Sequence, residues 1–445
     1  MLRKFLQLLF CPYCGSDFEL EALAEENGEI ITGCLKCECS EFPIISGILI
    51  LKDSPLNKDI IKLIKERKSE EAIAQYLCCE NFEKINSLET TLDLPFPLSL
   101  KLRWMEKQII LTLARAEEKK KCRKIYKNYS DKGISFHELL GTTFYETYLK
   151  HRFSGETLWS LYPFIPLIKN KNERILDLCC GVGYTSFILS NYVEPQQLCC
   201  ADLVFSRLYL AKKYFAPNAQ FVCLNADYPL PFKNKSFASI LMLDAFNYIR
   251  TRALLAREVE RLLLTDGLVL LLHIHNSYGF NLGGGTAISP KALVNLFKNS
   301  YLKTKVIPER NVLTNFVFGD KLDIGKEFSE EELNSSNALI LMATLDKSIF
   351  KTYNKVNSDF LSIRSHLIIN PIYEMKRKDS KFLLKRPLHK YALGDIYPFS
   401  EKYLPKEIEL SENLLTGREV KSKYIEKVDE LMKQFVVVNV PPNYI

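Results

Sequence analysis

Two Cys-x-x-Cys pairs near the beginning of the chain have the spacing of a metal site. They are Cys11/Cys14 and Cys34/Cys37, about 20 residues apart, which is within the range for four-cysteine zinc sites. Each pair turns tightly enough to aim two thiolates at one ion, and two pairs complete the tetrahedron that zinc prefers. The spacing predicts a structural zinc on these four cysteines. The alternatives are that Cys39 replaces Cys37 or that the thiols are free core side chains.

A second pattern, ILDLCCGVGY at 175–184, has the composition of a loop that cradles a nucleotide-like ligand. A short apolar run carries Asp177, a loop of small residues with Gly181 and Gly183 follows, and a run with helical character comes next. Glycines let the backbone approach a ligand closely, and a helix N-terminus offers unpaired N–H groups. This order predicts the strand, tight turn and helix that open nucleotide-binding α/β domains.

Acids also stand at the ends of the next apolar runs. Asp202 ends QLCCAD, Asp227 ends FVCLNAD, and Asp244 ends ILMLD. An acid at the tip of the second strand is placed to accept hydrogen bonds from ribose hydroxyls, although Asp202 and Asp227 are alternatively surface-loop acids. Because apolar runs alternate with helical patterns, the sequence predicts an α/β fold with parallel strands and right-handed crossovers.

Residues 150–347 resemble the class I S-adenosylmethionine-dependent methyltransferases. The resemblance is carried by the acid-and-glycine loop, Asp202, Asp227, the LPF…SF passage before the fourth strand and the REV-x-R-x-L…G passage before the fifth. It implies a Rossmann-like core with a mostly parallel seven-stranded sheet. It also implies S-adenosyl-L-methionine as the cofactor.

The same resemblance implies where parts of the cofactor lie. Gly181 and Gly183 are expected beside its methionine half, and Asp177 near its amino group. Asp202 is expected on the ribose and Asp227 opposite the adenine amino group. The family usually has glycine or alanine where Cys179 stands. The full expected cofactor set is Asp177, Cys179, Gly181, Gly183, Asp202, Leu203, Ala226, Asp227 and Asp244.

Polar residues after the fourth and fifth strands are candidates for the reacting end. Methyl transfer needs the acceptor held collinear with the donated methyl group, and a base helps when the acceptor is a hydroxyl or an ammonium. We expect one of His273 and His275 to face the cleft and the other the interior, with a structural role as the alternative. Tyr248 is a candidate to cover cofactor or substrate. The candidate catalytic set is His273, His275, Tyr248 and Asn247.

The string EFPIISGILIL at 41–51 extends the first pattern. It resembles the end of a small zinc-ribbon family of the methyltransferase-activator type, some of whose members are partners of methyltransferases.

Upstream of the first core strand, Tyr145 and Tyr148 are candidates to line the cofactor pocket. The expected parts are a zinc-ribbon domain at 1–52, a mainly helical region at 53–149, an S-adenosylmethionine-binding methyltransferase domain at 150–347 and a C-terminal accessory α/β module at 348–445.

Composition limits the class of protein. The chain has 445 residues, of which 47% are hydrophobic and 25% charged, with a net charge of +7, so it suits several globular domains. No apolar run reaches the roughly 20 residues that span a bilayer, and MLRKFLQLLF is too short for a secretory signal. The 13 cysteines, several in adjacent pairs, favour a reducing compartment, and we expect a cytoplasmic protein.

These patterns lead to one expected function and two alternatives. We expect an S-adenosylmethionine-dependent methyltransferase (EC 2.1.1) that acts on a small molecule, with no membrane or DNA partner. The first alternative is a ribosomal RNA base methyltransferase that recognises RNA through the zinc ribbon. Against it, residues 15–30 are acidic and DAFNY replaces the N-P-P-Y or D-P-P-Y string of many base-amino methyltransferases. The second alternative is a non-catalytic scaffold with the same fold.

Overall fold

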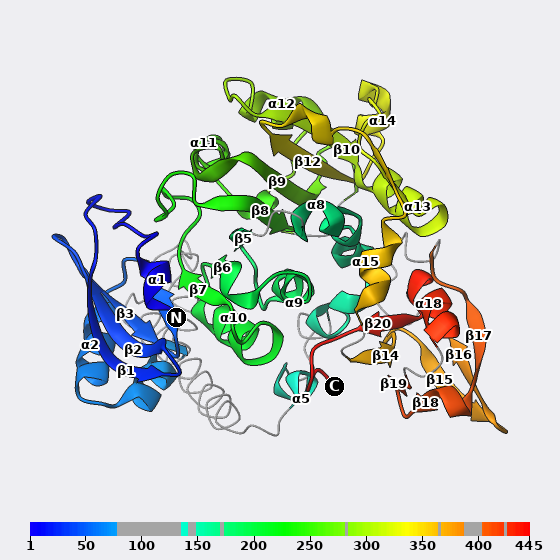
Figure 1. Cartoon of the computed structure of the whole chain (residues 1–445), viewed down its shortest axis with the longest axis horizontal. Coiled ribbons are helices and arrows are strands. Elements are labelled where there is room, and N and C mark those ends of the chain that lie inside the picture. The colour runs from blue at the N-terminus through cyan, green and yellow to red at the C-terminus, as the bar shows by residue number, and fades with distance from the viewer. Residues whose placement is uncertain are drawn as a thin grey trace, which may run out of the picture.

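A large twisted sheet with helices on both faces forms the centre of the molecule (Figure 1). The structure is a computed structural model of the chain, and it describes residues 1–77, 135–140, 148–169, 173–280, 284–363, 366–386, 403–421 and 425–445. From one edge to the other, the strands of this sheet are β1 (Glu19–Glu26), β2 (Glu29–Lys36), β3 (Glu41–Ile45), β4 (Ile48–Ile50), β7 (Gln220–Cys223), β6 (Leu198–Asp202), β5 (Ile175–Leu178), β8 (Phe237–Leu243), β9 (Leu263–His275), β12 (Ala338–Thr344) and β10 (Lys303–Pro308).

The middle of the sheet is parallel and buried on both faces. β5 pairs in parallel with β6 and β8, and these pair in parallel with β7 and β9. Side chains alternate between the two faces: Leu268 and Leu270 of β9 join one core, and Val269 and Leu271 join the other. This double burial explains why the strands read as unbroken apolar runs rather than alternating ones.

Each core is closed by its own helices. The first core contains side chains of α9 (Tyr184–Ser190), α10 (Phe205–Leu210) and α13 (Glu309–Gly319). The second contains side chains of α11 (Arg252–Leu262) and α12 (Pro290–Leu296). The predicted alternation of strands and helices is therefore confirmed between residues 175 and 319.

Residues 175–344 contribute seven strands to this sheet, and the four N-terminal strands, which the sequence did not place in it, extend it to eleven. Ile48, Leu49 and Ile50 of β4 pair in parallel with Phe221, Val222 and Cys223 of β7. The predicted zinc-ribbon segment thus covers the edge of β7, which would otherwise expose unpaired backbone groups. In Figure 1 these strands, coloured blue, stand at one end of the sheet.

Helices connect the N-terminal strands to the core where residues 53–149 are described. α2 (Leu56–Lys65) buries Ile60, Ile61 and Ile64, a second helix spans residues 69–77, and α5 is Phe136–Leu140. Tyr145 lies outside the described residues. Four short elements lead into β5: η1 (Arg152–Ser154), α7 (Glu156–Trp159), η2 (Tyr162–Phe164) and α8 (Ile165–Lys169).

The C-terminal part forms two smaller sheets. One contains β18 (Leu415–Thr416), β19 (Glu419–Val420), β14 (Leu367–Ile369) and β20 (Val437–Asn439); the other contains β15 (Glu374–Lys378), β16 (Lys381–Lys385) and β17 (Glu407–Ser411). With α18 (Ile425–Lys433), this part packs onto the elements upstream of β5, where Trp159 stacks on Phe435 with ring centroids 3.8 Å apart. Among all described residues, no helix is both long and apolar enough to cross a membrane.

Candidate cofactor pocket and cysteine cluster

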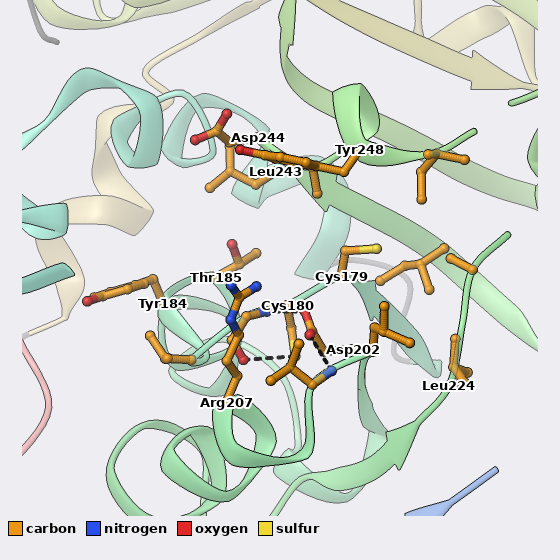
Figure 2. A pocket seen from close by; sticks show the side chains of 18 of the residues that line it. Cys179, Cys180, Tyr184, Thr185, Asp202, Arg207, Leu224, Leu243, Asp244 and Tyr248 are labelled. Carbon is orange, nitrogen blue, oxygen red and sulfur yellow. Dashed lines mark hydrogen bonds between the residues drawn. The ribbon is translucent and has the colours of Figure 1, made fainter. Parts of the chain in front are cut away.

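A cavity of about 420 Å³ opens at the carboxyl end of β5 (Figure 2). The chain runs from β5 to β6 and β7 on one side and then returns to β8 and β9 on the other. Such a reversal leaves a crevice at the strand ends, which is where open α/β sheets bind their ligands. The cavity walls come from residues 178–182, 202–204, 224–227 and 243–245, together with side chains upstream of β5.

The loop after β5 has the backbone geometry that its glycines permit. Gly181 and Gly183 have φ angles of +57° and +97°. A side chain on Gly183 would place its Cβ 2.9 Å from the Cβ of Ala211, so only glycine fits at this contact. Cys179 also has a positive φ, +60°, which costs energy for a residue with a Cβ. Cys179, Gly181 and the residue between them line the cavity.

Asp202 ties the second strand to this loop. Its Oδ2 accepts a hydrogen bond from the N–H of Gly181 at 2.9 Å, and its Oδ1 accepts one from the N–H of Val204, also at 2.9 Å. The carboxylate lies at the cavity wall beside Leu203, which is 46% exposed. The structure thus brings Asp202, Leu203 and the glycine loop together, as the sequence predicted.

Asp177 lies behind the loop rather than in the cavity. Its buried carboxylate accepts a hydrogen bond from Ser186 Oγ of α9 at 2.6 Å. Burial raises the pKa of Asp177 to about 7, although the Ser186 hydrogen bond opposes the shift. Among the described residues, Asp177 is not one that lines the cavity. Its side chain joins β5 to α9, and contact with the cofactor's amino group remains a prediction.

Asp227 lines the cavity, but its carboxylate is engaged elsewhere. Oδ1 accepts hydrogen bonds from the backbone N–H groups of Arg250 and Thr251, at 2.7 and 3.0 Å. These residues immediately precede α11, so Asp227 fixes the start of that helix. Ala226 stands next to it in the cavity wall, and contact with adenine remains a prediction for both residues.

Asp244 forms the centre of a charged cluster at the opposite end of the cavity. Its Oδ2 accepts hydrogen bonds from Arg152 Nη2 at 3.0 Å and from the Tyr148 hydroxyl at 3.1 Å. Its Oδ1 lies 3.3 Å from His275 Nε2. Burial alone would raise the pKa of Asp244, but Arg152, His275 and His273 together hold it below its ordinary value.

Both histidines turn toward Asp244, so the expectation that they diverge is wrong. Residues i and i+2 of a strand share a face, and the rings of His273 and His275 lie 5.6 Å apart. His273 Nδ1 is 2.7 Å from Glu309 Oε2. Burial opposes a charged ring, yet Glu309 and Asp244 raise the pKa of His273 to about 9. In the described part of the chain, Asp244 stands between the cavity and both histidines.

Asn247 and Tyr248 have different surroundings. Asn247 is buried, and its Oδ1 accepts a hydrogen bond from the backbone N–H of His275 at 3.0 Å. It therefore positions the end of β9 instead of facing a ligand. Tyr248 lines the cavity and is 57% exposed. Gly284 lies so close to its ring that an added Cβ would be 3.2 Å from Tyr248 Cε1.

The segment from β5 to the middle of β9 also has recognisable relatives. Residues 175–267 match a family model described as a methyltransferase domain. The chain contains a class I S-adenosylmethionine-dependent methyltransferase domain. The coarse prediction of fold and enzyme family is therefore confirmed for this segment.

Solved structures that resemble the methyltransferase domain are distant in sequence. The YcgJ protein from Bacillus subtilis is 20% identical; the match covers 42% of this chain and 99% of that one, with a TM-score of 0.31. An S-adenosylmethionine-dependent methyltransferase from Mesorhizobium loti is 16% identical over 41% of this chain and 97% of its own, with a TM-score of 0.32. Comparison with curated proteins gave no match.

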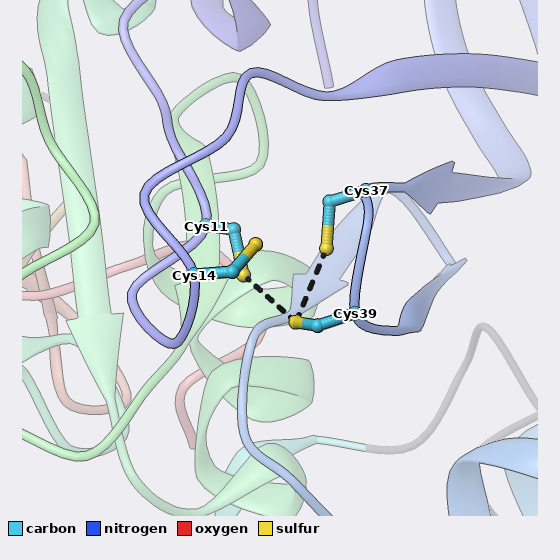
Figure 3. Close-up of side chains that lie close together, drawn as sticks. All are labelled: Cys11, Cys14, Cys37 and Cys39. Atoms are coloured by element: carbon cyan, nitrogen blue, oxygen red, sulfur yellow. Dashed lines mark hydrogen bonds between the residues drawn. The ribbon is translucent and has the colours of Figure 1, made fainter.

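Four cysteine side chains of the N-terminal segment lie close together (Figure 3). The sulfur atoms of Cys11, Cys14, Cys37 and Cys39 all lie within 4.8 Å of one another. Cys39 Sγ is 3.6 Å from the sulfurs of both Cys11 and Cys37. Four thiolates on one tetrahedral zinc are about 3.8 Å apart when the Zn–S bonds are about 2.3 Å, so this donor set fits zinc.

Cys34 does not belong to the cysteine cluster, which corrects the predicted ligand set. It lies within β2, paired with Pro43 of β3, and its side chain is buried in the first core. Burial raises the pKa of the Cys34 thiol to about 11. Cys39 takes its place because it lies in the turn between β2 and β3, where the backbone is free to aim a thiol at Cys11.

The methyltransferase domain also uses residues that sequence reasoning missed. Arg152 lies upstream of β5 and Glu309 begins α13, yet both meet at the Asp244 and His273 side chains. No local motif marks either residue, since their roles depend on contacts between distant segments. Tyr148 was a candidate for the cofactor pocket and does line the cavity.

Proposed function

We propose that this chain transfers a methyl group from S-adenosylmethionine to a small-molecule acceptor. The observation that supports this most directly is the cavity at the strand switch point, with the glycine loop and Asp202 on its wall. When bound, the cofactor supplies a methyl group already activated by its sulfonium. The protein then needs to hold cofactor and acceptor in line and to exclude water.

The cofactor's binding groups are divided between the ends of β5 and β6. Backbone of the Gly181 loop would contact the methionine half, and the Asp202 carboxylate would accept hydrogen bonds from the ribose hydroxyls. Asp202 accepts hydrogen bonds from two backbone N–H groups. Its oxygens keep further lone pairs, which can accept hydrogen bonds from the ribose. Leu203, half exposed at the cavity wall, offers an apolar face for adenine.

The acceptor is proposed to bind at the end of β8. Asp244 lines that part of the cavity as a charged carboxylate, held by Arg152 and Tyr148. A carboxylate in this position orients an N–H or O–H group of the acceptor and stabilises positive charge that develops on it during transfer. His273 and His275 act through Asp244, because it separates them from the cavity, and Tyr248 covers the open side.

A small acceptor agrees better than RNA with the charges of the N-terminal strands. β1 carries Glu19, Glu21, Glu25 and Glu26, and its C-terminal half is exposed. Nucleic-acid binding normally needs a basic stripe that contacts phosphates. We propose that the cysteine cluster is a structural zinc site and that the protein acts in the cytoplasm.

Calorimetric titration with S-adenosylmethionine and its demethylated product tests the cofactor site. Asp202→Ala is expected to weaken both affinities roughly 100-fold, since it removes two hydrogen bonds to a charged group, each worth about 1.5 kcal/mol. Asp17→Ala is the matched control, because Asp17 is an exposed acid that pairs with Lys233 at the surface. Equal affinity in wild type and Asp202→Ala would contradict the proposed site. Absence of binding to wild type would favour the scaffold alternative.

Transfer of a radiolabelled methyl group tests the acceptor class. Wild-type protein is incubated with labelled S-adenosylmethionine and either a small-metabolite extract or total RNA. Label in the metabolite fraction that disappears with Asp202→Ala supports the proposal. Label in RNA, with none in the metabolite fraction, would replace it with the RNA alternative.

A further inference from the structure

Three groups that commonly bind metals converge at the ends of β8 and β9. One carboxylate oxygen of Asp244 and one ring nitrogen each of His273 and His275 lie within 4.8 Å of one another. His275 Nε2 is 3.3 Å from Asp244 Oδ1. Two ligands on a tetrahedral zinc are about 3.4 Å apart when each bond is about 2.1 Å. We infer that these three side chains bind one divalent transition-metal ion, separate from the cysteine cluster.

Glu309 gives His273 the orientation of a metal ligand. Its Oε2 lies 2.7 Å from His273 Nδ1, and the Glu309 side chain is almost fully buried. With Nδ1 engaged, Nε2 is the nitrogen left for an ion. Metal-binding histidines usually donate their second nitrogen to a carboxylate in this way, which fixes both tautomer and ring orientation.

Asp244 has one oxygen held and the other directed at the histidines. Arg152 and Tyr148 both donate to Oδ2, whereas Oδ1 faces His275. The backbone at the cluster is unusual as well: Asp244 and His273 have φ angles of +54° and +52°. Positive φ costs energy in residues with a side chain and concentrates at functional sites.

The local charge balance favours a cation. Asp244 and Glu309 contribute two negative charges and Arg152 one positive charge. Without an ion, a proton on His273 supplies the remaining positive charge beside Glu309. Metal ligation requires a neutral imidazole, so a divalent ion at Nε2 would take the place of that proton and keep the buried carboxylates partnered.

The donor set also indicates which metals fit. Two imidazole nitrogens and one carboxylate oxygen suit Zn²⁺, Fe²⁺ and Co²⁺, whereas Mg²⁺ and Ca²⁺ prefer oxygen ligands alone. Three protein ligands leave at least one coordination position open, as in catalytic rather than structural sites. Because Asp244 stands between this site and the cavity, an ion here would fix and polarise the carboxylate that the acceptor meets. That last role rests on the proposed function, whereas metal binding does not.

Cobalt provides a probe that distinguishes the two clusters. Protein purified with its zinc is titrated with Co²⁺, and bound metal and the visible absorption spectrum are measured. We expect one equivalent of cobalt whose spectrum lacks the thiolate-to-cobalt charge-transfer bands of a cysteine site. His273→Ala and His275→Ala should each weaken cobalt binding at least tenfold. His366→Ala, which changes a histidine of the C-terminal part, should leave it unchanged.

Two further measurements keep the outcomes separate. Circular dichroism checks that each variant is folded, and His275→Asn replaces His275→Ala if the latter is not. Titration with S-adenosylmethionine is performed on the same samples. Folded wild type that binds S-adenosylmethionine but no cobalt, or cobalt binding that survives both histidine substitutions, would overturn the inferred site. Cobalt binding without cofactor binding would overturn the proposed function and leave the metal site standing.

Discussion

The cysteine cluster and the Asp244 cluster both gather metal-binding side chains, but they are built in different ways. Cys11, Cys14, Cys37 and Cys39 come from two turns within the first 40 residues, and two of the four are exposed. Asp244, His273 and His275 come from two adjacent strand ends in the interior. The first cluster lies partly at the surface and crosslinks two turns. The second is supported by a complete core and by charged partners from other segments.

Because the two clusters are built differently, they contribute different things to the molecule. A site that joins two turns supplies folding free energy, because the ion crosslinks segments that are separate in the unfolded chain. A site inside a finished core contributes charge and coordination positions, and its removal leaves the fold in place. Loss of the cysteine cluster should therefore be measured as unfolding. Loss of the Asp244 cluster should be measured as a change in charge, with the fold intact.

Loss of the cysteine cluster should change the stability of the protein more than any other substitution considered below. Cys39→Ser should abolish stoichiometric zinc and unfold the N-terminal strands, since a structural zinc site contributes on the order of 10 kcal/mol. Because β4 pairs with β7, the edge of the methyltransferase domain should lose protection as well. Metal analysis and hydrogen exchange measured along the chain check both expectations.

Cys34 supplies the matched control for this experiment. Cys34→Ala removes one buried sulfur from the core and should cost roughly 1 kcal/mol while zinc is retained. Zinc lost from Cys34→Ala and kept by Cys39→Ser would restore the ligand set that the sequence predicted.

The same comparison shows what the sequence can and cannot reveal. The glycine loop and Asp202 were predictable because one strand, turn and helix define them, and their contacts stay within a single βαβ unit. Cys34 was misassigned because the spacing of its Cys-x-x-Cys pair does not tell whether both cysteines lie in one turn. Once Cys34 is fixed in the ladder of β2, only the turn residues Cys37 and Cys39 can reach Cys11.

At the reacting end, the residue types were predictable and their partners were not. His273 and His275 could be named from the end of an apolar run. Their orientation required the pairing of β9 with its neighbours, and Glu309 and Arg152 entered through folding of segments that lie far away in sequence. The eleven-stranded sheet was missed for a similar reason, since β4 and β7 are distant in the chain.

An intermediate effect should come from the buried carboxyl group behind the Asp244 cluster. Burial and nearby Glu309 raise the pKa of Glu156 to about 8, from an ordinary value of 4.5. Its Oε2 has no hydrogen-bond partner within the described residues. The native state therefore keeps a proton that the unfolded chain releases, so stability from this group falls as pH rises from about 4.5 to about 8.

Glu156→Gln should remove this pH dependence. The variant is expected to match wild type in thermal stability at low pH, where the carboxyl is protonated in both states, and to exceed it progressively as pH rises, by a few kcal/mol at most. Thermal unfolding across this range measures the difference, and Glu138→Gln, at an exposed position of α5, serves as the comparison. A difference between Glu156→Gln and wild type that stays constant with pH would show that this carboxyl group does not titrate in the native state.

The smallest change in stability should come from a cysteine that belongs to neither cluster. Cys179 has a φ of +60° in the cofactor loop, and a Cβ in this conformation costs about 1 kcal/mol. Cys179→Gly should relieve that strain and stabilise the cofactor-free protein by up to about 1 kcal/mol, less the entropy that glycine adds to the unfolded chain. Cys180→Gly is the matched control, because Cys180 is not in the left-handed conformation and its buried side chain would be lost. Urea unfolding measures both variants. If Cys179→Gly and Cys180→Gly are destabilised alike, packing of the Cys179 thiol contributes more to stability than relief of the backbone strain does.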